Sequence, residues 1–259
     1  MTAEYRVFWQ PGCSSCLRAK EFLTKNGIAF QSINVRVETE AMDELARWGV
    51  RSIPVVARGD AFVLGQDLDE LAAFVGITLD RVHLAPAELV VRINAMLLTA
   101  GRHVMQLPRE ELATPLPGRD RTLLDLAFHV GMIPWAFLVA ARGETLVFEF
   151  FDRRAPADKQ TPEAVRGFLD EVRDDVATWW AASGDQMPET VSTYYGEQPA
   201  KNVLERTAWH AAQHCRQLQA VLEQRGITPD GPLGDAELAG LPLPDEIYDD
   251  EVGLTATGD

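Results

Sequence analysis

The pattern of apolar residues changes near residue 80, and this change limits the folds open to the chain. Before it, short apolar stretches typical of strands alternate with helix-like stretches. After it, apolar residues recur every three or four positions over four long stretches, and no strand pattern follows. The length of 259 residues exceeds the roughly 100–200 residues of an average domain. The sequence therefore predicts two domains, an α/β domain followed by an all-α domain.

The first eighty residues predict the order β-α-β-α-β-β-α. Glycines at 27 and 76 suit the ends of two of the helices, and Asp67 suits the start of the last one. The expected strands are 5–9, 30–35, 54–57 and 61–64, and the expected helices are 16–26, 38–48 and 68–76.

Cys13 and Cys16 stand in the turn between the first strand and the first helix. A cysteine at a helix N-terminus has its thiolate favoured by the helix dipole and by free N–H groups. A second cysteine one turn later can attack a mixed disulfide on the first. We therefore expect Cys13 to be the nucleophile and Cys16 the resolving thiol. The same spacing serves half of a zinc site or a structural pair, but the sequence holds no second C-x-x-C to complete a zinc site.

Three motifs in register resemble the glutaredoxin and thioredoxin superfamily over roughly residues 4–77. They are Pro11-Gly12-Cys13-Ser14-Ser15-Cys16, Ser52-Ile53-Pro54 and Gly65-Gln66-Asp67. The resemblance implies a thioredoxin-like fold, with a mixed four-stranded sheet and flanking helices. It also implies a cis Pro54 facing the dithiol, a backbone at Ile53 that pairs with a thiol substrate, and thiol binding at Gly65, Gln66 and Asp67. The alternative for Pro54 is a trans proline that opens a strand.

The sequence does not identify the thiol that reacts with the dithiol. Glutathione-using members of that superfamily typically have Gly-Gly before the capping aspartate and often a basic residue upstream of the dithiol. This chain has Gly65-Gln66 and Gln10 at those positions. Another low-molecular-weight thiol or a protein disulfide is therefore an equally open partner.

The second half of the chain predicts a four-helix bundle with one long crossover between its second and third helices. The expected helices are 86–107, 122–141, a third that begins at Thr161-Pro162, and 200–224. The expected boundaries are 1–79 for the α/β domain, 80–86 for a linker, 87–228 for the bundle and 229–259 for an acidic tail.

Two of the five histidines, His210 and His214, stand four residues apart on the last predicted helix. That spacing puts both rings on one helix face, and Val203, Leu218 and Val221 on the same stripe should turn them toward the core. Such a pair is often a coincidence. His129 lies on the flank of the apolar stripe of the second predicted helix. Three neutral imidazoles would bind a divalent metal such as zinc, nickel or iron and leave positions open for substrate.

The last helix reads His210-Ala-Ala-Gln-His214-Cys-Arg-Gln217-Leu218. With His129 on the second helix, this pattern resembles the DinB-like family of four-helix bundles over roughly residues 87–226. The family includes mycothiol-dependent maleylpyruvate isomerase and bacillithiol transferases. The resemblance implies a metal site at His129, His210 and His214, a low-molecular-weight thiol cosubstrate and a small electrophilic substrate.

Two residues near these histidines have competing interpretations. Asp125 stands four residues before His129 and either orients its ring or is a solvated helix acid. Cys215 is turned about 100° from His214 on a helix, so we expect a packed thiol.

Charge and composition exclude some classes of partner. The net charge of −15 disfavours nucleic acid and anionic membranes as partners. No apolar run approaches the roughly 18 residues of a membrane span, and the N-terminus shows no leader pattern, so we expect a soluble cytoplasmic protein. No Lys or Arg follows Arg225, whereas nine acids do, which predicts a solvated acidic tail. Bundles of this kind often pair through exposed helix faces, so a homodimer is among the expected assemblies.

Three functions fit these features. The first is a metal-dependent, thiol-linked transferase or isomerase whose Cys13/Cys16 domain reduces a disulfide of the thiol. The second is a glutaredoxin-like electron-transfer protein whose bundle serves docking or oligomerisation. The third is a redox or metal sensor without turnover.

Overall fold

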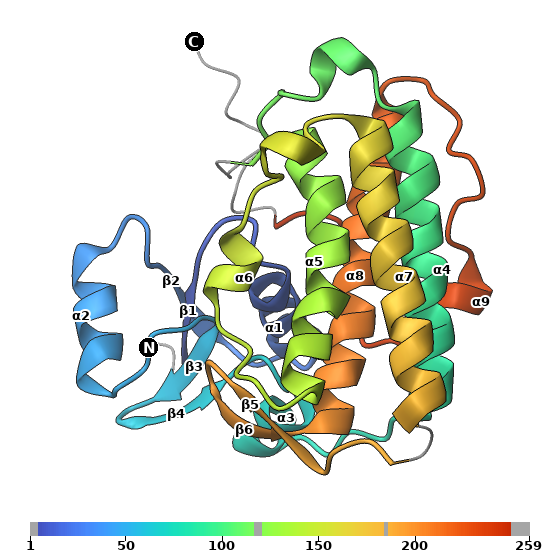
Figure 1. Cartoon of the computed structure of the whole chain (residues 1–259). Helices are drawn as coiled ribbons and strands as arrows, with labels where there is room; N and C mark the ends of the chain where they lie inside the picture. Colours follow the sequence, from blue (N-terminus) through green and yellow to red (C-terminus); the bar gives the residue numbers. More distant parts are fainter. Residues whose placement is uncertain (1–4, 117–120, 184–185, 250–259) are drawn as a thin grey trace, which may run out of the picture. The chain divides into compact units, whose positions relative to one another are not determined.

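A computed structural model describes residues 5–116, 121–183 and 186–249 of the chain (Figure 1). The chain divides into two compact units. Among the described residues, the thioredoxin-like unit contains 5–82 together with 244–249, and the bundle unit lies within residues 83–243. Residues 244–249 thus belong to the first unit, although they fall within the tail from residue 229 that the sequence predicted.

The thioredoxin-like unit is built on a mixed four-stranded sheet in the order β2-β1-β3-β4. The central strand β1 pairs in parallel with β2 and antiparallel with β3, which in turn pairs antiparallel with β4. The strands are β1 (Tyr5–Trp9), β2 (Phe30–Asn34), β3 (Val55–Arg58) and β4 (Ala61–Leu64). This arrangement confirms the predicted thioredoxin-like fold.

Helices cover both faces of this sheet because successive side chains of a strand point to opposite faces. Val7 of β1 packs in one apolar cluster with Leu23 of α1 (Ser14–Lys25) and Leu71 of α3 (Leu68–Phe74). The next residue, Phe8, packs in a second cluster with Leu45 of α2 (Thr39–Arg47). Helices α1 and α3 therefore cover one face, and α2 covers the other.

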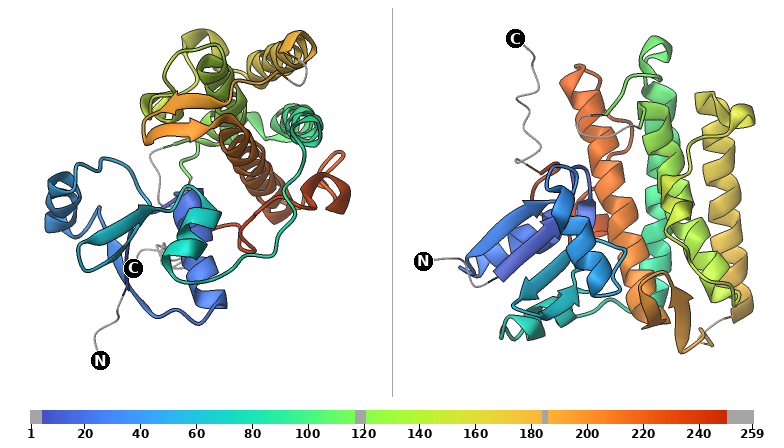
Figure 2. Two further views of the ribbon diagram at one scale, coloured as in Figure 1. Left: turned by 90° about the horizontal axis from the view of Figure 1, so that it is seen from below. Right: turned by 90° about the vertical axis from the view of Figure 1, so that its left-hand side faces the viewer.

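Four long helices form the bundle unit, as predicted. They are α4 (Pro86–Gln106), α5 (Leu123–Ala141), α7 (Pro162–Ser183) and α8 (Ala200–Gln224). Helices α4 and α5 each pack against both α7 and α8 (Figure 2). One continuous apolar core runs between them.

Helix α5 has the predicted extent but is more apolar than the sequence analysis expected. Among the described residues it is the one helix that reaches, by length and composition, what a membrane crossing needs. In the structure, 89% of the most apolar 18-residue stretch of α5 is buried, as expected for a helix in the core of a bundle. The expectation that no apolar run approaches a membrane span is therefore corrected.

The connections of the bundle hold elements that the sequence did not predict. They are α6 (Glu149–Asp152), the 3₁₀ helices η1 (Arg109–Glu111) and η2 (Ala157–Lys159), α9 (Asp235–Leu238), β5 (Thr190–Thr193) and β6 (Gly196–Pro199). Strands β5 and β6 pair as a short antiparallel hairpin. This hairpin is an addition to the helical second domain that the sequence predicted. Its strands have four residues each and are mostly polar, so they lack the apolar alternation that marks a strand in sequence.

The predicted solvated tail is also corrected for its described part. Leu233 and Leu241 are buried in the bundle unit. Within the thioredoxin-like unit, residues 245–249 lie along α1, where Asp249 forms an ion pair with Lys20 at 2.9 Å. Composition alone did not predict this packing, because a few buried leucines and ion pairs with residues of opposite charge are enough to hold an acidic segment against the protein. Asp250, Glu251 and Asp259 lie outside the described residues.

Candidate functional site

The dithiol lies at the start of α1, where the sequence predicted it. Cys13 is the N-cap residue, and its Sγ accepts a hydrogen bond from the Cys16 backbone N–H at 3.2 Å. The two cysteines form a disulfide. Cys16 is fully buried, whereas Cys13 is partly exposed. In the reduced protein the same N–H favours a thiolate on Cys13, and only Cys13 is presented to a substrate.

The Ile53–Pro54 peptide bond is cis, as the resemblance implied. The loop that carries it is tied to the residues before α3. The Gly65 N–H donates to the Pro54 carbonyl at 2.9 Å, and Gln66 Nε2 donates to the Ile53 carbonyl at 2.8 Å. A Cβ at Gly65 would lie 2.8 Å from Pro54 Cγ, so this contact requires glycine. Four of the predicted thiol-binding residues are thus brought together.

Asp67, the fifth predicted thiol-binding residue, caps α3. Its side chain accepts hydrogen bonds from the backbone N–H groups of Asp69 and Glu70. The role of these five residues in thiol binding stays a prediction.

Two arginines that the sequence reading did not single out support this region. Arg18 of α1 is buried and donates to the Gln66 carbonyl at 2.9 Å. Arg36 donates from Nε to the side-chain oxygen of Gln10 at 3.1 Å. Gln10 holds the position where glutathione-using proteins often have a basic residue. Arg36, which follows the end of β2, therefore places a positive charge beside that position. The sequence alone does not show this, because Arg36 and Gln10 meet only through the pairing of β1 with β2.

The three predicted metal ligands converge in the bundle unit. His129 comes from α5, and His210 and His214 come from successive turns of α8. Their candidate ligand nitrogens all lie within 4.8 Å of one another. His210 Nε2 and His214 Nε2 are 3.1 Å apart. All three side chains are buried.

The periodicity of α5 did not point His129 inward because nearly every side of this helix is apolar. Most residues of α5 are buried, including those on the flank of its predicted stripe. His129 is 1% exposed and faces both His210 and His214, with ring centroids 5.5 Å and 4.8 Å away. A helix that is apolar all round carries no directional signal in sequence.

Gln217 holds one of these rings in a defined orientation. Its Oε1 lies 2.7 Å from His214 Nδ1. An amide oxygen only accepts hydrogen bonds, so His214 Nδ1 carries the proton and Nε2 presents its lone pair. Ligating histidines are commonly oriented by such a partner. Gln217 was noted in the sequence as part of the helix motif but was given no role.

The donor set fits a divalent metal. Ligand nitrogens about 2.0–2.1 Å from a tetrahedral zinc lie about 3.3 Å apart, and the His210–His214 separation is 3.1 Å. Three neutral imidazoles suit zinc, nickel or iron and leave coordination positions for other ligands. Phe151 of α6 packs its ring against His129 and His210, with centroids 6.1 Å and 5.8 Å away, and so covers one side of the cluster.

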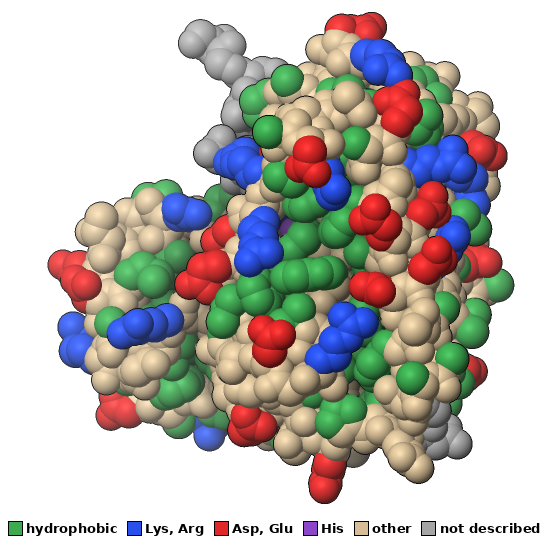
Figure 3. Space-filling model, viewed as in Figure 1, with side chains coloured by type: hydrophobic (Ala, Val, Ile, Leu, Met, Phe, Trp, Pro, Cys, Tyr) green, Lys and Arg blue, Asp and Glu red, His purple; other side chains and the backbone are tan. Residues whose placement is uncertain are grey.

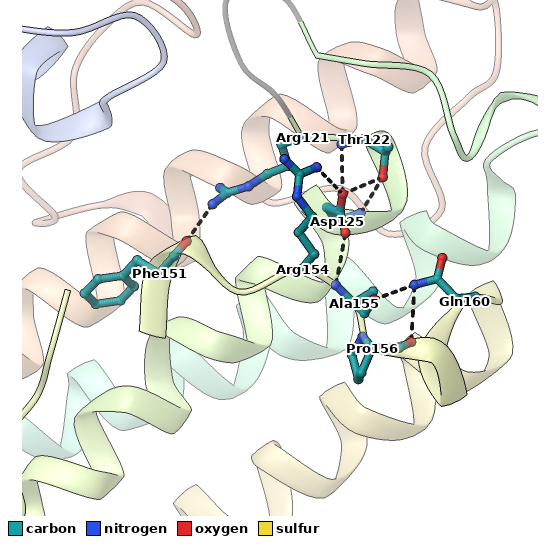
Figure 4. A network of polar contacts seen from close by, with 8 residues as sticks. All are labelled: Arg121, Thr122, Asp125, Phe151, Arg154, Ala155, Pro156 and Gln160. Atoms are coloured by element: carbon teal, nitrogen blue, oxygen red, sulfur yellow. Dashed lines mark hydrogen bonds and ion pairs between the residues drawn. The ribbon is translucent and has the colours of Figure 1, made fainter. Parts of the chain in front are cut away.

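Asp125 neither orients His129 nor lies in solvent, which corrects both interpretations. It is buried and forms a capping box with Thr122 at the start of α5. Its other oxygen accepts the Ala155 N–H at 3.0 Å, and Arg154 approaches at 3.4 Å (Figure 4). Burial opposes the charge, but the hydrogen bonds from Thr122 and Ala155 outweigh it and hold the pKa of Asp125 below its ordinary value. The residue fastens the segment after α6 to α5.

The remaining histidines of the bundle unit have other surroundings. His83 Nδ1 lies 3.2 Å from a carboxylate oxygen of Glu205. His103 is fully buried on α4, and burial lowers its pKa to about 4, assisted by the charge of Arg102. Cys215, predicted to be packed, is buried with its thiol 3.3 Å from the Met96 carbonyl. None of these residues is in the cluster formed by the other three histidines.

The fold and the two centres define the class of protein. The first unit is a thioredoxin-like domain with a C-x-x-C dithiol at a helix N-terminus and a cis-proline loop. The second is a helical bundle with three buried, convergent histidines. Such a chain joins a thiol redox domain to a candidate metal-binding bundle.

Comparisons with known proteins place both units in families. Residues 6–63 match the Glutaredoxin family, and residues 98–218 match the DinB superfamily. The glutaredoxin-like protein NrdH of Lactococcus lactis subsp. cremoris (strain MG1363) is 30% identical over 66 residues, covering 26% of this chain and 92% of that protein. The Gene 56 protein of Mycobacterium phage L5 is 35% identical over 71 residues, covering 27% of this chain and 69% of that protein.

A further relative shares part of the same region. The N-acetyl-S-hydroxy-L-cysteine reductase of Bacillus subtilis (strain 168) is 40% identical over 55 residues, covering 20% of this chain and 59% of that protein. The chain belongs to the glutaredoxin-like proteins through its N-terminal domain, which is fused to a C-terminal DinB-like domain.

Proposed function

We propose that this protein is a metal-dependent, thiol-linked enzyme in which the bundle promotes reaction of a low-molecular-weight thiol with a small electrophile. The dithiol domain reduces the disulfide or other oxidised form of that thiol. The observation that carries the proposal is the convergence of His129, His210 and His214, with Gln217 setting the orientation of His214. This convergence argues against a bundle that serves only docking or oligomerisation.

The dithiol step follows from the exposure of its two sulfurs. The Cys13 thiolate attacks one sulfur of a small disulfide, forming a mixed disulfide and releasing one thiolate. The Cys16 thiolate then attacks the Cys13 sulfur, which releases the second thiol and leaves the Cys13–Cys16 disulfide. A sulfenic acid would react in the same way, with water as the first leaving group, and the Bacillus subtilis relative is named for an S-hydroxy-cysteine substrate. An external thiol reductant regenerates the dithiol.

In the bundle, the three histidines would hold the metal. Bound there, a divalent metal would supply Lewis-acid charge that stabilises a thiolate at neutral pH. Gln217 keeps the lone pair of His214 directed into the cluster, and the burial of the rings excludes bulk water. Phe151 keeps the adjoining surface apolar, which favours a small organic substrate.

Elemental analysis of the purified full-length protein tests the metal site. We expect about one equivalent of zinc, nickel or iron per chain, and a near-complete loss in His210→Ala. His83→Ala is the matched control, because it removes a histidine of the same unit that lies outside the cluster. A metal-free wild type whose behaviour His210→Ala leaves unchanged would overturn the proposal.

A thiol-dependence screen on the metal form then separates the alternatives. Turnover of an electrophile that requires both metal and thiol supports the enzyme. Disulfide reduction that depends on Cys13 but survives loss of all three histidines, with no other turnover, would favour the electron-transfer protein. Metal binding without turnover would favour a sensor. A cytoplasmic location belongs to the same proposal, because a reducing dithiol needs a reducing compartment.

A further inference from the structure

A buried arginine stands one helical turn before His210. Arg206 belongs to α8 and is 7% exposed. Residues four apart on a helix share a face, so Arg206 continues the row formed by His210 and His214. Its guanidinium carbon lies 5.4 Å from the centroid of the Phe151 ring, and that ring also packs on His210. The charge of Arg206 is thus held next to the histidine cluster.

Arg206 has fewer partners than a buried guanidinium normally has. Its Nη2 donates to the Tyr194 hydroxyl oxygen at 3.2 Å, and its charge lies near the rings of Phe151 and Tyr195. Its Nε is buried with no hydrogen-bond partner. Within the described part of the chain, no carboxylate lies within ion-pair distance of it. Burying a cation without a counter-charge is costly, so the structure indicates that an anion from outside completes the site.

Arg121, a second buried arginine, differs from Arg206 in its surroundings. Arg121 donates to the Phe151 carbonyl (Figure 4), and burial lowers its pKa to about 10, but the carboxylates of Asp152 and Asp125 act on it in the opposite direction. Arg121 therefore already lies in the field of protein carboxylates. Arg206 has an unpartnered Nε and, among the described residues, no carboxylate within ion-pair distance, which makes it the better candidate for binding a ligand.

The neighbouring hydroxyl completes a donor pair. Tyr194 accepts from Arg206, so its own O–H is left to donate to a third group. A carboxylate matches this arrangement, since it accepts from a guanidinium and from a hydroxyl together. Figure 3 shows hydrophobic side chains gathered over α6 and the adjoining part of α5, with a small area of histidine visible among them. A small ligand with an apolar body and one carboxylate suits such surroundings.

We propose that Arg206 and Tyr194 form a carboxylate subsite beside the histidine cluster, so that the ligands of the bundle are carboxylate-bearing small molecules. The inference rests on the proposed function and names its substrate class. The carboxylate belongs either to the thiol, whose sulfur then faces the histidines, or to the electrophile.

Cobalt substitution tests the subsite without an activity assay. The full-length chain carrying Cys13→Ser and Cys16→Ser is loaded with Co²⁺, so that probes do not react with the dithiol. The probes 3-mercaptopropionate and 2-mercaptoethanol are titrated while the thiolate-to-cobalt absorption band is followed. We expect 3-mercaptopropionate to bind on the order of 10- to 100-fold more tightly, the range of a charge-assisted hydrogen bond. Arg206→Gln should abolish this preference without weakening 2-mercaptoethanol, whereas the matched surface variant Arg166→Gln should keep it.

Two further variants and one further ligand sharpen the result. Arg206→Lys should keep part of the preference, because it retains the charge but not the planar donor pair. Tyr194→Phe removes only the hydroxyl and should reduce the preference, which keeps the test open if Arg206→Gln does not fold. If maleate binds together with 2-mercaptoethanol and does so only with Arg206 present, the carboxylate belongs to the electrophile. If maleate does not bind, it belongs to the thiol.

The two proposals fail in different ways. Equal affinity for both thiols in the wild type together with no Arg206-dependent binding of maleate overturns the carboxylate subsite. So does a thiol preference that persists in both Arg206→Gln and Tyr194→Phe. Bound cobalt that gives no thiolate band with either probe overturns thiol activation by the bundle. In that case, propionate binding followed by ligand-observed NMR still tests Arg206.

Discussion

The dithiol and the histidine cluster differ in how the chain builds them. Cys13, Cys16 and the N–H group between them lie within one turn at the start of α1. The histidine cluster joins α5 to α8, two helices that are far apart in the sequence and meet only when the bundle packs. The dithiol is therefore a local motif, whereas the cluster is a product of tertiary structure. Changes at one centre should leave the chemistry of the other intact.

The largest expected effect is at the dithiol. Cys13→Ser should abolish reduction of a small disulfide such as 2-hydroxyethyl disulfide, while the metal content of the bundle stays unchanged. Cys16→Ser should retain the first step and accumulate a mixed disulfide on Cys13, detectable by intact-protein mass spectrometry. Loss of metal in Cys13→Ser would instead indicate that the cysteines are half of a metal site.

The free thiols should differ strongly in reactivity. Burial raises the pKa of the Cys215 thiol, and its side chain is closed off in the bundle core. In the reduced native protein, iodoacetamide should label Cys13 on the order of 100-fold faster than Cys215. Peptide mapping after timed labelling measures this ratio, and denatured protein, in which all three cysteines should react alike, is the control. Comparable rates in the native state would show that the bundle opens at Cys215.

A smaller effect is expected from changing Gln217, which orients one histidine of the cluster. Gln217→Leu removes the acceptor that orients His214 and should weaken metal binding about 10- to 100-fold. Gln217→Glu should bind nearly as tightly as the wild type, because a carboxylate oxygen also accepts from Nδ1. Competition with a chromophoric chelator measures the affinities, with Gln219→Leu on the same helix as control. Unchanged affinity in Gln217→Leu would mean that packing alone orients the ring.

The smallest expected effect concerns the stability of the bundle. Asp125→Ala removes a capping box and a buried acceptor and should lower the free energy of unfolding by about 1–3 kcal/mol. The pKa of Asp125 is lowered in the folded protein, so its contribution is present above the ordinary value of 3.8 and is lost as the pH falls through the lower folded value. The difference between wild type and variant should thus be constant from pH 5 to 7 and shrink below about pH 4.

Chemical unfolding of the two proteins measures this difference at each pH. The Cys13-dependent disulfide reduction of the variant should be unchanged at pH 7, because the cap belongs to the other unit. A gap that widens in acid would contradict the assignment of Asp125 as a charged cap.

The secondary structure around both centres was largely readable from the sequence. Strand β1, helix α3 and the four bundle helices begin within a residue or two of the predicted positions, because apolar spacing, Asp67 before α3 and Pro162 at the start of α7 mark them locally. The β5–β6 hairpin was missed because its short polar strands carry no such spacing. The packed acidic segment was missed because its partners, such as Lys20 for Asp249, stand more than two hundred residues away.

The sequence by itself determined the chemistry available at each centre: a dithiol one turn apart at a helix start, and an imidazole pair one turn apart on a helix face. Both depend on near neighbours along the chain, whose relative positions follow from helix geometry. Only the tertiary structure decided that His129 points at that pair, that Asp125 is a cap, and that Arg206 is buried with no carboxylate from the described residues within ion-pair distance. These facts depend on which side of one helix meets another, and α5, apolar on nearly every side, leaves that choice to packing.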